Sequence, residues 1–134
     1  MIERYIDIDG YWGILLCFDY DRRDLPRMRS IMESFGLSEY KIIEAIGVLR
    51  HRNTGMSISD SGVTMSVMFI SPATSLEEFE DTISHEVDHV QDAILKYYDV
   101  EHGGEPAAWT QGYITKRITR VLINEGFLCS PEYR

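Results

Sequence analysis

The clearest apolar pattern in the chain runs from Leu76 to Tyr97, where apolar residues recur at the spacing of an α-helix. Helical residues three or four apart lie on one face, so this pattern predicts a long helix with one side against a core. Ser75 and Glu78 form an S-x-x-E capping box that defines its start. The predicted apolar stripe consists of Leu76, Phe79, Ile83, Val87, Val90, Ile94 and Tyr97.

Two pairs of apolar segments predict β-hairpins in the first half of the chain. Residues 4–8 and 11–20 flank Asp9-Gly10, which is a strong signal for a tight turn. Residues 56–59 and 63–70 surround Asp60-Ser61-Gly62 in the same way. We therefore expect four strands.

Three further helices are predicted, over residues 26–35, from the N-cap Ser38 to Arg50, and over residues 106–124. Strands together with helices indicate an α/β (α+β) fold. A chain of 134 residues without a linker fits a single domain, 1–134, with one core. The packing faces of the second and third of these helices are expected to contain Ile42, Ile43, Ala45, Ile46 and Leu49, and Ala108, Ile114, Ile118, Val121 and Leu122.

The polar side of the long helix contains the sequence H-E-x-x-H, from His85 to His89. Residues four apart are about 6 Å apart along a helix axis, so both imidazoles can face one metal ion. Zn²⁺ binds such nitrogen ligands, and the carboxylate of Glu86 could take a proton from water at the metal. The alternative is a pair of solvated surface histidines.

The segment after the helix contains the candidates for a third metal ligand. Glu105 is expected at the start of the last helix, because Gly103-Gly104 forms a turn and Pro106 suits the first helical position. Two histidines and one glutamate would leave a fourth position for water, as in catalytic zinc sites. Glu101 and His102 are the alternative ligands, and both lie in the loop.

The pattern H-E-x-x-H, a spacer, then G-E-x-A-A-[aromatic]-x-x-G-Y resembles the gluzincin metallopeptidases, most closely their minimal members. The resemblance covers about residues 53–126. It implies a zincin-like fold, in which a small twisted mixed sheet packs on helices and its edge strand, here residues 63–70, lines the cleft. The alternative for residues 63–70 is an ordinary internal strand. It also implies His85, His89 and Glu105 as zinc ligands and Glu86 as general base.

Trp109 departs from some larger gluzincins, which carry an acidic residue at that position. The residue that orients the zinc histidines is therefore expected to be Asp92 or Asp81. Tyr113 lies eight residues after Glu105 and could donate a hydrogen bond to a developing oxyanion. The alternative for Tyr113 is a packed ring with a solvated hydroxyl.

Composition limits the partners. The net charge of −9 argues against binding to nucleic acid or to an anionic membrane, and a peptide or protein substrate is expected. The two cysteines, Cys17 and Cys129, match no paired-cysteine zinc motif and indicate a reducing compartment. No signal peptide or membrane-spanning stretch is seen, so we expect a cytoplasmic protein.

The leading hypothesis is a zinc metallopeptidase that hydrolyses peptide bonds. The alternative is a zinc-binding regulatory module without turnover, although a structural site is normally closed by a fourth protein ligand. H-E-x-D-H also resembles the peptide deformylase motif, but no E-G-C-x-S segment precedes His85. A further hypothesis is that the tail after Phe127 holds the enzyme latent, with Cys129 on the metal. The alternative, which we favour, is a terminus that is disordered or packed on the surface.

Overall fold

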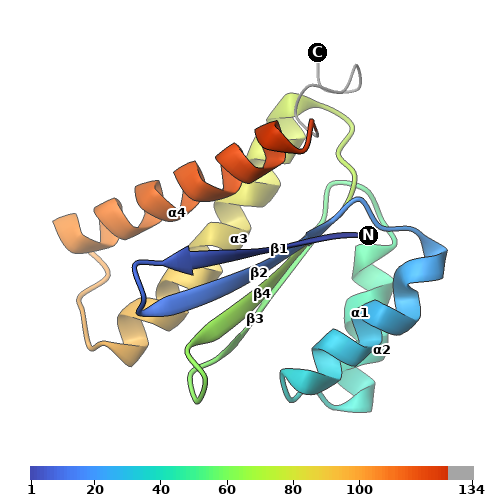
Figure 1. Cartoon of the computed structure of the whole chain (residues 1–134), viewed down its shortest axis with the longest axis horizontal. Helices are drawn as coiled ribbons and strands as arrows, with labels where there is room; N and C mark the ends of the chain where they lie inside the picture. The colour runs from blue at the N-terminus through green and yellow to red at the C-terminus, as the bar shows by residue number, and fades with distance from the viewer. Residues whose placement is uncertain (127–134) are drawn as a thin grey trace.

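A four-stranded mixed sheet lies at the centre of the fold, with helices on both of its faces (Figure 1). The computed structural model describes residues 1–126. The strand order is β1-β2-β4-β3. β1 (Ile2–Ile8) is antiparallel to β2 (Trp12–Phe18), β2 is parallel to β4 (Met65–Ile70), and β4 is antiparallel to β3 (Gly55–Asp60).

Both predicted hairpins are confirmed. In the first, Ile8 lies opposite Trp12, and the turn between them contains Asp9 and Gly10 with φ values of +50° and +79°. Glycine and aspartate accept this left-handed conformation more readily than most residues. The turn chemistry read from the sequence therefore corresponds to the backbone observed.

Four α-helices follow the predicted positions closely. They are α1 (Leu25–Ser34), α2 (Glu39–Leu49), α3 (Leu76–Tyr97) and α4 (Glu105–Asn124), and a short 3₁₀ turn, η1 (Arg22–Asp24), precedes α1. α3 has the bounds that the apolar pattern predicts. Its N-cap is also confirmed, because the Ser75 hydroxyl accepts a hydrogen bond of 3.1 Å from the backbone N–H of Glu78.

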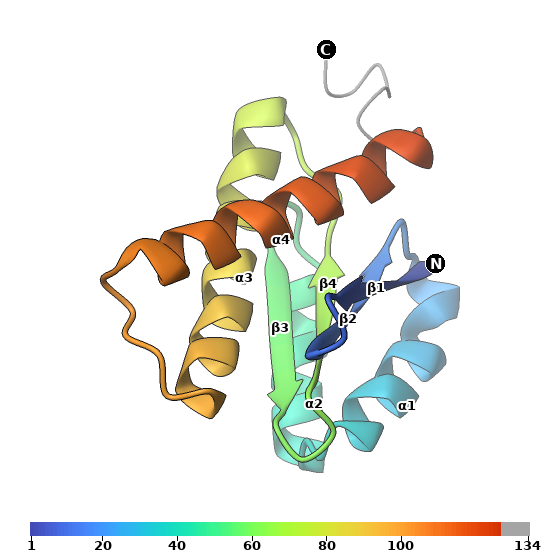
Figure 2. The same cartoon turned by 60° about the vertical axis from the view of Figure 1, so that its left-hand side comes forward.

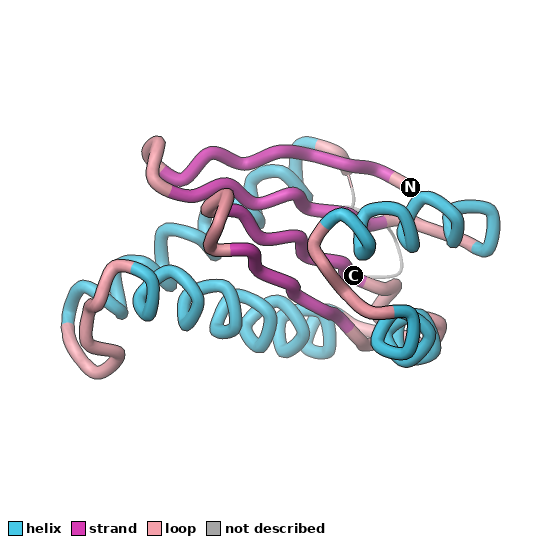
Figure 3. The backbone as a smooth tube through the Cα atoms, turned by 90° about the horizontal axis from the view of Figure 1, so that it is seen from below, coloured by secondary structure: helices cyan, strands magenta, loops and turns pink. Residues whose placement is uncertain are grey.

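The helices form two layers, α3 and α4 on one face of the sheet and α1 and α2 on the other (Figures 2 and 3). On the face of the sheet that they share, α4 crosses α3 (Figure 2). Side chains alternate across a strand, so neighbouring residues of β2 enter different layers. Leu16 and Phe18 pack with α3 and α4, whereas Cys17 packs with α1 and α2. The structure thus has two hydrophobic clusters instead of the single core expected.

Of the two alternatives for residues 63–70, the structure shows the internal strand, and the sheet edge that the resemblance implies there is wrong. β4 lies between β2 and β3, and β3 is the edge strand. The reason is visible in β4 itself, since Val67 and Phe69 are buried on one face while Met68 and Ile70 are buried on the other. A strand that is apolar on both faces belongs in the interior of a covered sheet.

Four residues assigned to packing faces are exposed in the structure. Leu76 and Tyr97 are the first and last residues of α3, and Ile43 and Ala108 lie on the solvent side of α2 and α4. Ala107 is buried in place of Ala108. Within residues 1–126 there is no helix whose length and hydropathy would suit a membrane span.

Candidate functional site

His85 and His89 lie on the exposed side of α3 and point toward each other. Their Nε2 atoms are 3.0 Å apart, and the two rings are edge to face with centroids 4.6 Å apart. Two nitrogens bound to one tetrahedral zinc lie about 3.3 Å apart, given Zn–N distances of about 2.0–2.1 Å. The pair therefore fits two ligands of one zinc ion, as the spacing predicts.

Glu86 faces inward, although both histidines beside it are exposed. The residue is 3% exposed, and the Ser57 hydroxyl donates a hydrogen bond of 3.0 Å to its Oε1. Burial raises the pKa of the Glu86 carboxyl, whereas the hydrogen bond from Ser57 and the nearby histidines lower it. A carboxylate with a raised pKa is a better proton acceptor, which suits a general base.

β3 approaches the α3 helix closely at Glu86. A Cβ added to Gly55 would lie 2.8 Å from Cγ of Glu86 and 3.0 Å from Cγ2 of Thr82. Only glycine fits at this distance. Gly55 thus allows the edge strand to lie against the helix face that carries Glu86.

The sequence did not indicate the contacts of Ser57 or Gly55 with Glu86. A usable signal exists, because Gly55, Ser57 and Ser59 are alternate residues of β3 and share one face. All three are small, and the Ser59 hydroxyl lies 2.6 Å from that of Ser66 on β4. A row of small residues on one face of a strand indicates close approach of another element, which here is α3.

Glu105 is the first residue of α4, as predicted, but the structure does not bring it together with the two histidines. It is exposed at the helix start. Within the described part of the chain, no three His, Cys, Asp or Glu side chains lie close enough together to hold a metal ion. The structure therefore brings together two of the three residues that the resemblance implies, and the loop before α4 holds the third elsewhere.

Among the other candidate ligands and orienting residues, His102 and Asp92 pair with each other. Nδ1 of His102, in the loop, lies 2.8 Å from Oδ1 of Asp92, one helical turn after His89. Asp81 and Glu101 are exposed. Asp92 thus contacts a histidine, but this is the loop histidine and not His85 or His89.

Tyr113 packs between α4 and the turn of the first hairpin. Its hydroxyl lies 3.1 Å from Oδ1 of Asp9 and accepts a hydrogen bond of 2.9 Å from Arg117. The Arg117 guanidinium lies 5.7 Å from the ring centroid and also donates to the carbonyl of Asp7. These contacts favour the packed alternative for Tyr113 over a role at the histidines.

Comparison with protein-family models, curated proteins and solved structures finds no match to this chain. Function is therefore inferred from residues and their contacts. The site combines two exposed imidazoles that converge, a buried carboxylate between them in sequence, and an edge strand beside it. Cys129 and the rest of the tail hypothesis lie outside the described residues.

Proposed function

We propose that this chain is a zinc-dependent metallopeptidase of the gluzincin type, which hydrolyses peptide bonds. The observation that carries the proposal is the position of Glu86, buried and hydrogen-bonded to Ser57 while the histidines before and after it converge in the exposed region. A zinc site with only a structural role needs two such imidazoles but has no need of a carboxylate held beside them.

His85 and His89 would hold the zinc ion, with Glu105 as the third ligand. Gly103 and Gly104 precede Glu105, and glycine permits backbone conformations closed to other residues. A rearrangement of this loop on metal binding is therefore part of the proposal. Bound zinc supplies Lewis-acid chemistry, which polarises a peptide carbonyl and makes water a better nucleophile near neutral pH.

Glu86 would accept a proton from the attacking water and return it to the leaving amine. Ser57 holds Oε1 of Glu86 and so fixes the direction of the carboxylate. β3 is the last strand of the sheet, and in the described chain no further strand pairs with its outer side. An extended peptide could pair with backbone groups along that edge, close to Glu86.

A second candidate function is a zinc-binding regulatory module without turnover. The position of Glu105 weighs against a preformed catalytic site with three protein ligands, because the described residues do not form a complete set of three. The two candidates differ in one property that can be measured, since only the peptidase requires the basicity of Glu86.

The test measures zinc content and peptidase activity of the purified full chain. We expect about one zinc per chain, lost in His85→Ala or His89→Ala and retained in His51→Ala, which replaces an exposed histidine outside the site. Glu86→Gln should keep the zinc while activity falls by at least about a hundredfold. A chain that binds no zinc would contradict both candidates, and one that binds zinc without any Glu86-dependent activity would support the module.

Glu105→Ala tests the third ligand separately. The expected result is strongly reduced zinc occupancy, measured by metal analysis after dialysis. Full occupancy in this variant would assign the third ligand to Glu101 or His102 instead, and Glu101→Ala and His102→Ala would then separate these two.

A further inference from the structure

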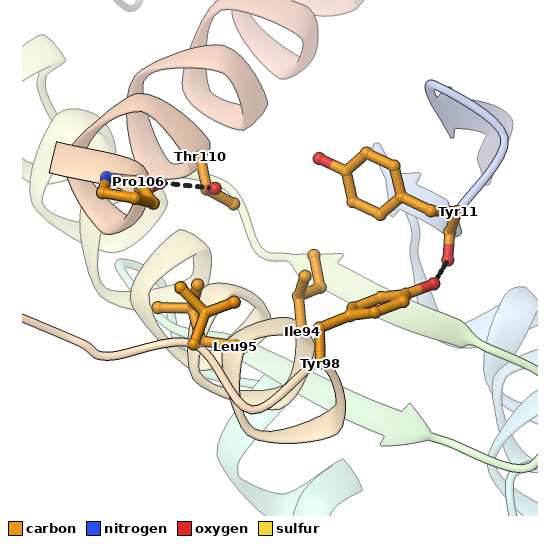
Figure 4. Close-up of a pocket in the computed structure, with 7 residues that line it drawn as sticks. Tyr11, Ile94, Leu95, Tyr98, Pro106 and Thr110 are labelled. Carbon is orange, nitrogen blue, oxygen red and sulfur yellow. Dashed lines mark hydrogen bonds between the residues drawn. The ribbon is translucent and has the colours of Figure 1, made fainter. Parts of the chain in front are cut away.

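An apolar pocket of about 370 Å³ opens between the end of α3 and the start of α4 (Figure 4). The surface of the pocket is mostly apolar, because the side chains around it present mainly carbon atoms. The residues labelled in Figure 4 are Tyr11, Ile94, Leu95, Tyr98, Pro106 and Thr110, and Val100 completes the lining.

The walls of the pocket are held in place by contacts of their own. Ile94 and Leu95 are each 3% exposed and belong to the packed part of α3. The Tyr98 hydroxyl donates a hydrogen bond of 2.7 Å to the carbonyl of Tyr11, and the two rings meet edge to face with centroids 5.8 Å apart (Figure 4). The pocket is therefore formed before any ligand binds, which lowers the entropic cost of binding.

Acidic residues flank the pocket lining in sequence. Asp99 and Glu101 stand on either side of Val100, and Glu105 precedes Pro106. All three are exposed. Few basic side chains are available to pair with these acids, since Lys96 is the one lysine or arginine between residues 94 and 110.

Asp9 adds a fourth acidic group on the hairpin side of the pocket. Asp9 is two residues before Tyr11, which lines the pocket, and its Oδ1 accepts a hydrogen bond of 3.1 Å from the Tyr113 hydroxyl. Arg117 donates to the same Tyr113 hydroxyl, so its positive charge lies near Asp9 and offsets part of the negative charge there. Within the described chain, Asp99, Glu101 and Glu105 remain without such a cation and favour a cationic ligand.

We propose that this pocket binds an apolar side chain of a peptide that carries lysine or arginine on the neighbouring residues. Apolar walls favour the side chain, and the exposed acids favour the flanking cations. A second copy of this chain is a poor occupant, because its net charge is also −9. The proposal deepens the function given above by naming a substrate class, and it rests on that function only in making the bound peptide a substrate.

The pocket is separate from the histidine pair. Leu95 is six residues after His89 on α3, a rise of about 9 Å along the axis. Six residues also turn about 120° away around the axis, so the pocket and the histidines lie on different sides of the helix. The pocket would therefore bind a part of the peptide that lies apart from the bond that is cleaved.

Binding of capped nonapeptides tests the proposal, with central sequences Lys-Leu-Lys, Lys-Ser-Lys and Glu-Leu-Glu in one constant background. Dissociation constants are measured by calorimetry on the full chain, with zinc chelated so that no peptide is consumed. We expect Lys-Leu-Lys to bind at least about tenfold more tightly than Lys-Ser-Lys, as burial of a leucine side chain predicts. It should also bind more tightly than Glu-Leu-Glu, with a difference that narrows at high salt.

A matched pair of variants locates the binding. Thr110 and Thr115 are both partly buried on α4, and each donates a hydrogen bond to the carbonyl four residues earlier, at 2.7 and 2.8 Å. Only Thr110 lines this pocket. Thr110→Phe should fill it and abolish the preference for leucine over serine, whereas Thr115→Phe should leave that preference unchanged.

Val100→Trp fills the pocket from the loop and serves if Thr110→Phe does not fold, as judged by circular dichroism. Equal affinity for the leucine and serine peptides, or a leucine preference that survives filling of the pocket, would overturn the proposal. Tight binding of Glu-Leu-Glu would overturn its cationic part. A leucine preference in a chain that binds no zinc would show that the binding site stands while the peptidase proposal fails.

Discussion

At the scale of single residues, the catalytic proposal depends on how Glu86 is held. Its carboxylate is buried, whereas His85 and His89 are exposed to solvent. The hydrogen bond from Ser57 compensates for the lost hydration of the carboxylate. A buried carboxylate without a donor costs about 1–3 kcal/mol or more. Ser57 is thus a positioning residue, which acts on the reaction only through Glu86.

Ser57→Ala should lower peptidase turnover by about tenfold while zinc content stays the same, because the carboxylate loses the hydrogen bond that fixes its direction. Ser59→Ala is the matched control, two residues along the same face of β3, with its hydroxyl at Ser66 instead. Turnover and zinc content are measured on both variants. Equal losses of turnover, or loss of zinc in Ser57→Ala, would argue for a general structural effect.

The sequence predicts the histidine pair but not the group that holds the carboxylate. His85 and His89 are four apart on one helix, so local geometry determines their meeting. Ser57 comes from a strand 29 residues before Glu86, and local periodicity carries no information about such a contact. Glu105 shows the opposite case, because its position at the helix start was predictable while its distance from the histidines depends on the loop.

At the scale of elements, the separation between β3 and α3 is set by Gly55. The contact of 2.8 Å that a Cβ would make with Cγ of Glu86 leaves no room for a methyl group unless the helix or the strand moves. Helix and sheet can approach here because the facing side chains of β3 are small. This spacing sets how closely the Glu86 side chain lies against β3.

Gly55→Ala should lower the free energy of unfolding by about 1–3 kcal/mol, since a methyl group is inserted into a filled contact. Gly47→Ala provides the contrast, because Gly47 lies in the interior of α2 with no atom near its added Cβ. Alanine is the better helix former, so that variant should gain about 0.5–1 kcal/mol. Chemical denaturation of the two variants checks both signs, and a neutral Gly55→Ala would mean that α3 moves freely from the sheet.

The bounds of elements were more predictable than their neighbours. Capping at Ser75 and the apolar period fix where α3 begins and how far it runs. A hairpin pattern, however, does not say which of its two strands pairs with the rest of the sheet. β4 takes the inner position because it is buried on both faces, whereas β3 carries serines on one of its faces.

At the scale of the whole molecule, the sheet separates two hydrophobic clusters. Cys17 belongs to the one under α1 and α2, and it is fully buried. Burial raises the pKa of its thiol to about 12, so the reactive thiolate is scarce at any ordinary pH. Reagents reach this thiol only when the helical layer separates from the sheet.

In a Cys129→Ser variant, where Cys17 is the one remaining cysteine, alkylation by iodoacetamide at pH 8 should be at least about a thousandfold slower than in the denatured chain. Mass spectrometry of quenched samples gives both rates. Native labelling at a rate near that of the denatured chain would mean that α1 and α2 open without global unfolding.

β2 is apolar on both faces, and this affects how its register with the neighbouring strands is fixed. A shift of β2 by one residue would exchange Leu16 and Cys17 between the two clusters and still leave apolar groups in apolar surroundings. Hydrophobicity alone therefore cannot select the native register of the central strand. Polar details select it instead: the Asp9-Gly10 turn sets one neighbour, and the hydrogen bond of 3.0 Å from the Trp12 indole to the Ser66 hydroxyl, both buried, sets the other.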